Sequence, residues 1–103
     1  PYGMDCSGFV DWVFYNITDG QYIIGHGGGA IMQHSYCTEI SWDEALPGDL
    51  VFYPGDEHVG IVGGRDEKGD LLVIHCASGA NNVVISGKSG FVSIAKPVFY
   101  QAF

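Results

Sequence analysis

The sequence has few basic residues, and this scarcity excludes several classes of partner. Four lysines and arginines stand against 12 aspartates and glutamates, so the formal net charge is −8. The four basic residues form no cluster, and the electrostatic field of such a chain repels nucleic acid and anionic surfaces. We therefore predict no nucleic-acid partner.

Long apolar runs are also missing. None approaches the roughly 20 residues that a helix needs to span a bilayer, so we predict no membrane-spanning segment. The 103 residues suit one compact domain, residues 1–103, with a single core. Because the chain begins at Pro1, only five residues before Cys6, we expect it to be part of a longer polypeptide. Its export signal and a separate targeting domain or segment would then lie elsewhere.

Cysteines are few and odd in number. Cys6, Cys37 and Cys76 allow at most one internal disulfide, so this is not a disulfide scaffold, and no C-x-x-C pair occurs. A zinc-binding structural module is an alternative, but these cysteines and the four histidines match no closed tetrahedral pattern, and His34-x-x-Cys37 is their one pair with the two-residue gap typical of zinc ligands. We assign Cys37 and Cys76 no role.

What the chain does contain is a helical first part followed by short strands. Apolar spacing predicts a helix from Cys6 to about Asn16 and a weaker one over 30–34, and Ser41 with Glu44 has the spacing of a capping box over 41–46. Runs rich in β-branched and aromatic residues, separated by turn signals, predict strands at 49–53, 58–64, 71–77, 83–86 and 97–103. We predict an α+β domain whose N-terminal helix packs on an antiparallel sheet of about five strands.

Cys6 stands at the start of the first predicted helix, behind Asp5, a residue type that caps helices. The first N–H groups of a helix lack partners and carry the positive end of its dipole, which stabilises a thiolate. Cys6 is therefore a candidate nucleophile. The alternative is a small apolar residue buried under the helix.

Two histidines are placed to assist such a thiol. His58 opens a predicted strand, and small Gly60 on the same face leaves room for a substrate. His75 lies within the next strand, with Cys76 on the opposite face. If the two strands are neighbours, the imidazoles lie side by side and one orients the other. The alternatives are a solvated edge residue for His58 and a hydrogen-bonded core histidine for His75.

His26 and His34 lie in the glycine-rich stretch between the helices. We interpret them as surface or substrate-rim residues.

Three blocks together carry a family resemblance: DCSGFV, then PGDLVFY with HVGIVGG, then VIH. In order and spacing the chain resembles the NlpC-like family of papain-like cysteine peptidases, which cut bacterial cell-wall peptides. The resemblance implies a papain-like fold, with Cys6 as nucleophile, His58 as base and His75 as the residue that completes the triad. It also implies that Asp5 and Ser7 line the substrate-amine side of the pocket.

The chain departs from the family pattern in three places. Family members usually carry a helix and a tyrosine ahead of the cysteine, where this chain has only residues 1–4, so the oxyanion site would rely on backbone N–H groups such as that of Cys6. The link over 65–70 is longer than usual, which lengthens a hairpin. The region 25–36 also differs, which affects the substrate groove.

The resemblance implies a cysteine endopeptidase that hydrolyses peptidoglycan stem peptides at the γ-D-glutamyl bond to the following diamino acid. It needs no metal or other cofactor, and it acts outside the bacterial cytoplasm, secreted or associated with the cell envelope. Amidases and acyl- or peptidyl-transferases share the triad and remain alternatives, as does a non-catalytic cell-wall binding module.

Overall fold

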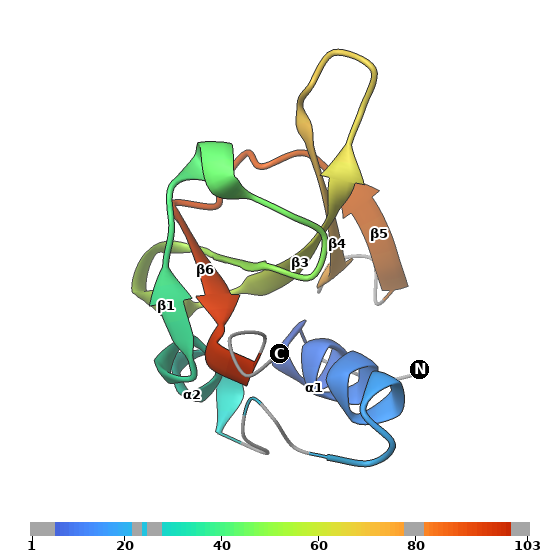
Figure 1. Cartoon of the computed structure of the whole chain (residues 1–103), viewed down its shortest axis with the longest axis vertical. Helices are drawn as coiled ribbons and strands as arrows, with labels where there is room; N and C mark the ends of the chain where they lie inside the picture. The colour runs from blue at the N-terminus through green and yellow to red at the C-terminus, as the bar shows by residue number, and fades with distance from the viewer. Residues whose placement is uncertain (1–5, 22–23, 25–27, 78–81, 100–103) are drawn as a thin grey trace.

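A computed structural model of the chain describes residues 6–21, 24, 28–77 and 82–99 (Figure 1). The α-helices are α1 (Cys6–Ile17) and α2 (Gly29–Ser35), and the 3-10 turns are η1 (Trp42–Glu44) and η2 (Pro54–Asp56). The strands are β1 (Cys37–Glu39), β2 (Leu50–Phe52), β3 (Val59–Arg65), β4 (Leu71–Ala77), β5 (Asn82–Ser86) and β6 (Ser93–Pro97). Within these residues no helix is long and apolar enough to cross a membrane.

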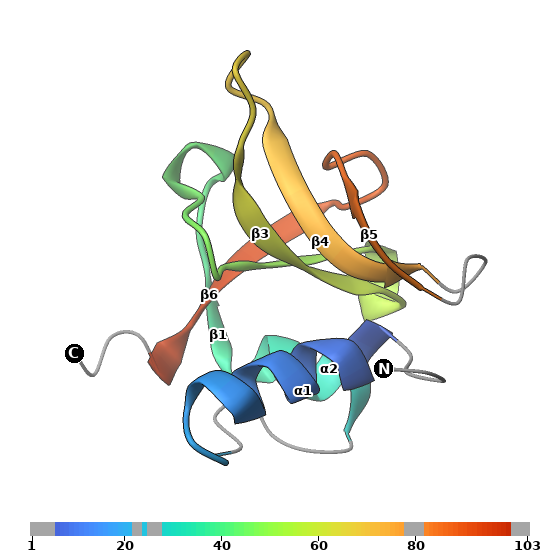
Figure 2. The same cartoon turned by 90° about the vertical axis from the view of Figure 1, so that its right-hand side faces the viewer.

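The six strands form one antiparallel sheet in the order β1-β6-β2-β3-β4-β5. Strands β2 to β5 follow one another as a meander, whereas β6 returns to pair with both β2 and β1. Both helices lie on one side of the strongly curved sheet (Figure 2). The predicted α+β fold with segregated helices is confirmed, with six strands in place of about five.

Helix α1 buries one apolar stripe and ends at a glycine signal. Phe9, Val10 and Phe14 are its buried residues, and their spacing of one, four and five positions puts them on one face. After the last turn Gly20 takes a positive φ of 89° and donates its N–H to the carbonyl of Tyr15 at 2.8 Å. A glycine in this left-handed conformation is a common helix end.

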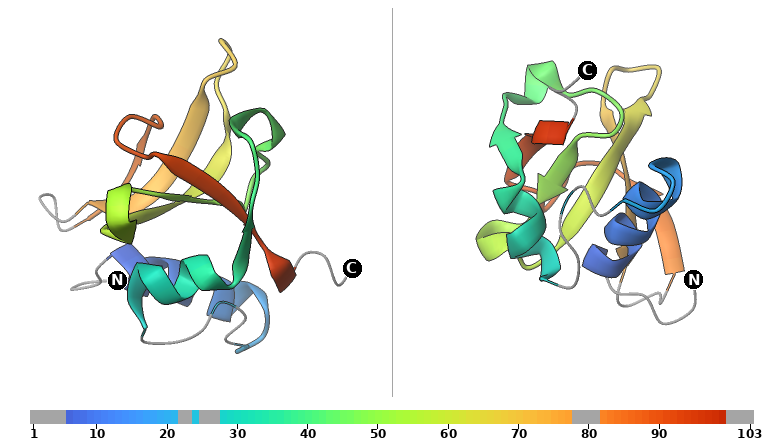
Figure 3. Two further views of the ribbon diagram at one scale, coloured as in Figure 1. Left: turned by 90° about the vertical axis from the view of Figure 1, so that its left-hand side faces the viewer. Right: turned by 60° about the horizontal axis from the view of Figure 1, so that its bottom comes forward.

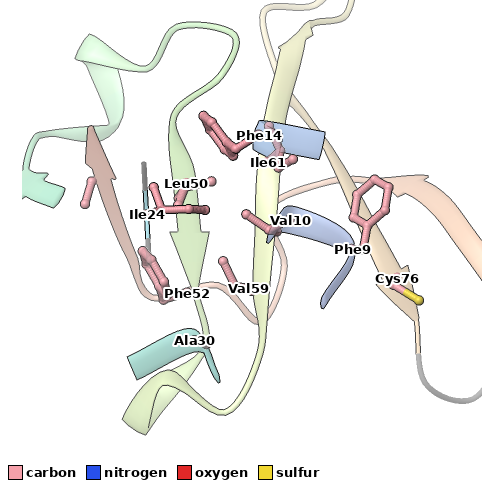
Figure 4. Close-up of a cluster of buried hydrophobic side chains, with 11 residues drawn as sticks. Phe9, Val10, Phe14, Ile24, Ala30, Leu50, Phe52, Val59, Ile61 and Cys76 are labelled. Carbon is pink, nitrogen blue, oxygen red and sulfur yellow. The ribbon is translucent and has the colours of Figure 1, made fainter. Parts of the chain in front are cut away.

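Apolar side chains cover both faces of the central strands, which explains why residues 50–53, LVFY, are apolar without alternation. One cluster lies between the helices and the sheet (Figure 4) and contains Phe9, Val10, Phe14, Ile24, Ala30, Leu50, Phe52, Val59, Ile61, Cys76 and Ala95. The second cluster lies on the other face and contains Ala45, Val51, Val62, Leu71, Val73, Phe91 and Ile94. Successive residues of β2 and β3 alternate between the two clusters, as the period of a strand requires.

The predicted C-terminal strand at 97–103 is wrong where the structure describes it, because β6 ends at Pro97 and residues 98–99 form a 3-10 turn. Residues 100–103 lie outside the described part, within which β6 is the last strand. Ala95 pairs with Leu50 of β2 and with Glu39 of β1. The β1 strand was not predicted, because its three residues are half-buried or exposed and carry no apolar alternation. Pairing with β6, rather than local sequence, makes β1 a strand.

Helix α2 connects α1 to the chain segment in front of β3. Buried Gln33 donates its Nε2 to the carbonyl of Ser7, in the first turn of α1, at 2.8 Å. The ring of His34 stacks on Phe52 at 4.0 Å between centroids. His34 Nδ1 lies 2.9 Å from Asp56 in η2, while its Nε2 contacts Glu39. Two adjacent residues of α2 therefore bind both the start of α1 and the turn that leads into β3, and so link these two elements.

The His34 contacts predict a pH-dependent contribution to stability. Burial lowers the pKa of His34, but hydrogen bonds and charges from Glu39 and Asp56 outweigh it and raise the pKa above 6.5. Its stabilising effect is thus complete below about pH 6.5 and is lost as the pH rises through the raised value. The difference in unfolding free energy between the native chain and His34→Phe, which keeps an aromatic ring against Phe52, should shrink by about 1 kcal/mol between pH 5.5 and 8.5.

Urea unfolding at both pH values measures this difference. Subtracting the variant removes the pH dependence of the other groups, since they are present in both proteins. A difference that stays constant across the range would contradict the assignment.

Gly60 leaves room for side chains of β4 and for Phe91 to pack against β3. A Cβ on Gly60 would lie 2.6 Å from Val73 Cγ1, 3.2 Å from His75 Cβ and 3.3 Å from Phe91 Cζ. The space beside Gly60, which the sequence suggested for a substrate, is therefore filled by the protein's own side chains, and that expectation is wrong.

Gly60→Ala should therefore destabilise the fold by about 1–3 kcal/mol, the usual cost of overpacking a core. Gly87→Ala is the matched control, because nothing lies within 4 Å of the added Cβ and the backbone there suits any residue. Thermal unfolding of both variants measures the effect. Equal midpoints for the two would refute the close packing.

Candidate active site

Cys6 is the first residue of α1 and is half-buried. It packs against the cluster that includes Val59 and Cys76, the chain neighbours of His58 and His75. Helix α1 contacts strands β3 and β4, and Figure 2 and the left view of Figure 3 both show it below the sheet. Cys6 thus starts the helix that contacts β3, which His58 precedes, and β4, which carries His75.

The two histidines are in direct contact. His58 immediately precedes β3, and its Nε2 lies 2.7 Å from Nδ1 of His75 on β4. Ile61 pairs with Ile74, so the same register puts Gly60 across from His75 and His58 on the diagonal, which long side chains can span. The predicted side-by-side placement of the imidazoles is confirmed.

His75 has a further polar partner on the next strand. Its Nε2 lies 2.8 Å from the hydroxyl of Ser86, at the end of β5, and the same hydroxyl donates to the carbonyl of Gly87 at 3.3 Å. Only 8% of His75 is exposed, so its two ring nitrogens are satisfied by His58 and Ser86. The contacts form a continuous series from β3 to β5.

Aromatic rings enclose the pair. Buried Phe91 stacks on His58 at 5.7 Å and meets His75 edge to face at 5.5 Å. Tyr53, directly after β2, meets both His58 and Phe91 edge to face at 4.8 Å. These two aromatic rings fix the orientation of the imidazole rings and exclude water from one side of them.

The enclosure changes the acid–base properties of both histidines. Burial, and secondarily the charge of His75, lowers the pKa of His58 below its usual 6.5. Burial also lowers the pKa of His75. Both rings are therefore neutral near pH 7, and a neutral imidazole can accept a proton from a thiol.

Ser7 is half-buried in the first turn of α1, where its carbonyl accepts the Gln33 hydrogen bond. Asp5 and His26 lie outside the described residues. His34, expected at the surface or the substrate rim, instead joins α2 to η2 and β1.

Three residues of the site were not found in the sequence: Tyr53, Ser86 and Phe91. Ser86 lies on the face of His75 because Val73 pairs with Ser86 and His75 with Val84. Strand alternation would indicate that face once the register is known, but the register depends on how the chain turns between β4 and β5. Phe91 lies between β5 and β6, outside any predicted element, so no periodicity marked it.

The other two thiols are in different environments. Burial, with the nearby charges of Glu39 and Asp49, raises the pKa of Cys37 to about 12, and its Sγ donates to the carbonyl of Gln33 at 3.3 Å. Cys76 is buried under α1. In the described part of the chain no three histidine, cysteine or acidic side chains form a group that could hold a metal ion.

Comparison with known proteins gives consistent matches. The model of the NlpC/P60 family matches residues 1–68, which include Cys6 and His58 but not His75. Over 68 residues the chain is 41% identical to the protein named probable endopeptidase p60 of Listeria grayi, covering 62% of this chain and 12% of that protein. Over 64 residues it is 42% identical to protein P54 of Enterococcus faecium, covering 59% and 12%. The chain thus spans about an eighth of the length of these curated relatives.

Solved structures agree along almost the whole chain. The NlpC/p60 domain of the peptidoglycan hydrolase SagA superposes with a TM-score of 0.73 at 30% identity, covering 91% of this chain and 77% of that one. The peptidoglycan hydrolase RipB of Mycobacterium tuberculosis gives 0.72 at 27%, covering 93% and 45%. With the family model matching well over half of its residues, the chain belongs to the NlpC/P60 family.

Proposed function

We propose that this domain is a cysteine peptidase of the cell-wall hydrolase class. The observation that carries the proposal is the 2.7 Å contact between His58 and His75. The helix that starts with Cys6 contacts β3 and β4, the two strands beside which and on which these histidines lie. A thiol at a helix start, an imidazole and a second imidazole holding the first are the parts of an activated nucleophile. Cys6 is the nucleophile, His58 the base, and His75 the residue that orients it.

The first half of the reaction forms an acyl-enzyme. Since Nε2 of His58 contacts His75, Nδ1 takes the proton as the Cys6 sulfur bonds to the substrate carbonyl carbon. The resulting oxyanion accepts hydrogen bonds from backbone N–H groups at the start of α1. The C–N bond then breaks, and His58 gives its proton to the leaving amine.

The second half releases the acid. A water gives a proton to His58 and attacks the thioester carbon, the C–S bond breaks, and the proton returns to the sulfur of Cys6. No step needs a metal or another cofactor. The lowered pKa of His58 keeps it unprotonated at neutral pH, which suits a proton acceptor.

The substrate is the peptide part of peptidoglycan, cut between γ-D-glutamate and the diamino acid. Relatives named as an endopeptidase and as peptidoglycan hydrolases support this class. Asp5 and Ser7 are proposed to line the side of the pocket that receives the substrate amine. A carboxylate suits an ammonium group, because opposite charges attract and share charge-assisted hydrogen bonds.

The biological setting is part of the proposal. Residues 1–103 form one domain of a longer polypeptide, which acts outside the cytoplasm of a bacterium, secreted or held in the cell envelope. A domain of net charge −8 is repelled by anionic wall polymers at low salt. A separate targeting segment is therefore proposed to bring it to its substrate.

Digestion of purified peptidoglycan tests the function. Mass spectrometry of the products should show new termini at the γ-D-glutamyl bond, and Cys6→Ser and Cys6→Ala should each lower the rate by about 10³-fold or more, since no other group replaces the thiolate. Cys37→Ser is the matched control and should keep full activity. Turnover by Cys6→Ser at the native rate would sink the assignment.

The same digestion with an added amine identifies the acceptor. A free carboxyl product alone defines a hydrolase. A product joined to the added amine defines a transferase, and a new terminus at the sugar-linked amide defines an amidase.

Thiol labelling gives an independent prediction. In the folded protein iodoacetamide should modify Cys6 first, because Cys37 with a pKa of about 12 has almost no thiolate at pH 7 and Cys76 is buried. Peptide mapping over time measures the three rates. His58→Ala should slow the labelling of Cys6 alone. Equal rates at the three thiols would contradict the special position of Cys6.

A further inference from the structure

The hydrogen-bond series beyond His58 ends at a residue that the proposed mechanism does not use. His58 Nε2 lies 2.7 Å from His75 Nδ1, and His75 Nε2 lies 2.8 Å from Ser86 Oγ. The hydroxyl of Ser86 in turn reaches the carbonyl of Gly87 at 3.3 Å. Three groups with exchangeable protons thus stand in a row that ends on a carbonyl oxygen.

The last member sets the direction of the row. A carbonyl oxygen only accepts, so the Ser86 hydroxyl donates to Gly87 and offers its lone pairs to His75. His75 then carries its proton on Nε2 and donates it to Ser86. A neutral imidazole has one N–H, so Nδ1 of His75 is an acceptor and receives the N–H of His58 Nε2.

This direction has a consequence for His58. With its single proton on Nε2, neutral His58 has an unprotonated Nδ1, the nitrogen that must receive the proton of Cys6. In the opposite direction, His75 would donate from Nδ1 to His58 Nε2, and Ser86 would donate to His75. His58 would then carry its proton on Nδ1 and could not act as the base there. The Gly87 carbonyl would also lose its donor.

We propose that Ser86 is a positioning residue, which holds His75 in the Nε2–H tautomer so that His58 presents a bare Nδ1 to Cys6. The proposal deepens the proposed function and rests on it for its catalytic consequence. The tautomer of His75 itself is a property of the folded protein and can be measured without any reaction.

The same series of hydrogen bonds stabilises protonated His58 during the reaction. When His58 takes the thiol proton it becomes an imidazolium, and its Nε2–H bond to His75 becomes charge-assisted and stronger. Bonds that point the same way polarise one another, so the Ser86 hydroxyl helps His75 to accept more strongly. Ser86 thereby stabilises the charged state of His58 without touching the substrate.

The pair Ser86→Thr and Ser86→Val separates the hydroxyl from the shape of the side chain. Thr and Val are nearly the same size, both suit a β-strand, and only Thr keeps the hydroxyl. The residue is exposed at the end of β5, so neither change disturbs the core. Near-ultraviolet circular dichroism and thermal unfolding check that both variants keep the native fold.

Nitrogen-15 NMR of the histidine rings is the direct test. In the native chain and in Ser86→Thr, His75 should show a protonated Nε2 and an unprotonated Nδ1, whereas Ser86→Val should show a mixture of tautomers. In the digestion assay Ser86→Val should lower kcat by about three- to tenfold, the effect of one lost hydrogen bond, with KM unchanged. Ser86→Thr should restore the native kcat.

The NMR measurement and the digestion assay test different claims. If Ser86→Val keeps the native tautomer of His75, or if the native chain shows the opposite tautomer, the inference is overturned whatever the activity. If the native chain digests no peptidoglycan while the tautomer shifts as expected, the inference about Ser86 stands and the proposed function fails.

Discussion

The contact between the two imidazole rings depends on the missing side chain at Gly60. The register puts this glycine across from His75, and its nearest neighbours are Val73, His75 and Phe91. Any larger residue would occupy the volume in which Phe91 now covers both rings. The register of β3 and β4, with side chains packed over Gly60, is thus the constraint that holds His58 2.7 Å from His75.

A second constraint concerns the helix that carries the thiol, because a nucleophile and a base on different elements must be held at a fixed separation. Helix α2 supplies the connection. Gln33 holds the first turn of α1 through the Ser7 carbonyl, and the next residue, His34, holds Asp56 in η2, two positions before His58. A segment that departs from the family pattern in sequence therefore has a structural role, because it holds both the first turn of α1 and η2.

Local sequence patterns were sufficient to predict those helices and strands whose own residues show an apolar pattern and a clear end. The α1 helix has an apolar stripe and a glycine end, and β4 is a short apolar run bounded by turn signals, so their bounds and, from the two-residue period of a strand, the faces of His75 and Cys76 could be predicted. The β6 strand could not, because its pairing with β2 and β1, and not a local apolar pattern, makes residues 93–97 a strand. Ser86 and Phe91 depend on strand register and on loop packing, which are interactions between distant residues. Nearby sequence does not encode them.

The histidines also show why charge alone does not set a protonation state. The chain carries 12 acidic and 4 basic residues, an excess that by itself favours protonated imidazoles. His34, which touches two carboxylates, follows this tendency and its pKa is raised. His58 and His75 touch each other and a phenylalanine, and burial lowers the pKa of both.

Because a protonated His75 has no lone pair on Nδ1, it could not accept the N–H of His58. The apolar cover from Phe91 and the hydroxyl of Ser86 therefore act on the same requirement. The ring keeps His75 neutral, and the hydroxyl selects which nitrogen carries the remaining proton. A carboxylate in the place of Ser86 would meet only the second need, since its negative charge would favour the imidazolium form of His75.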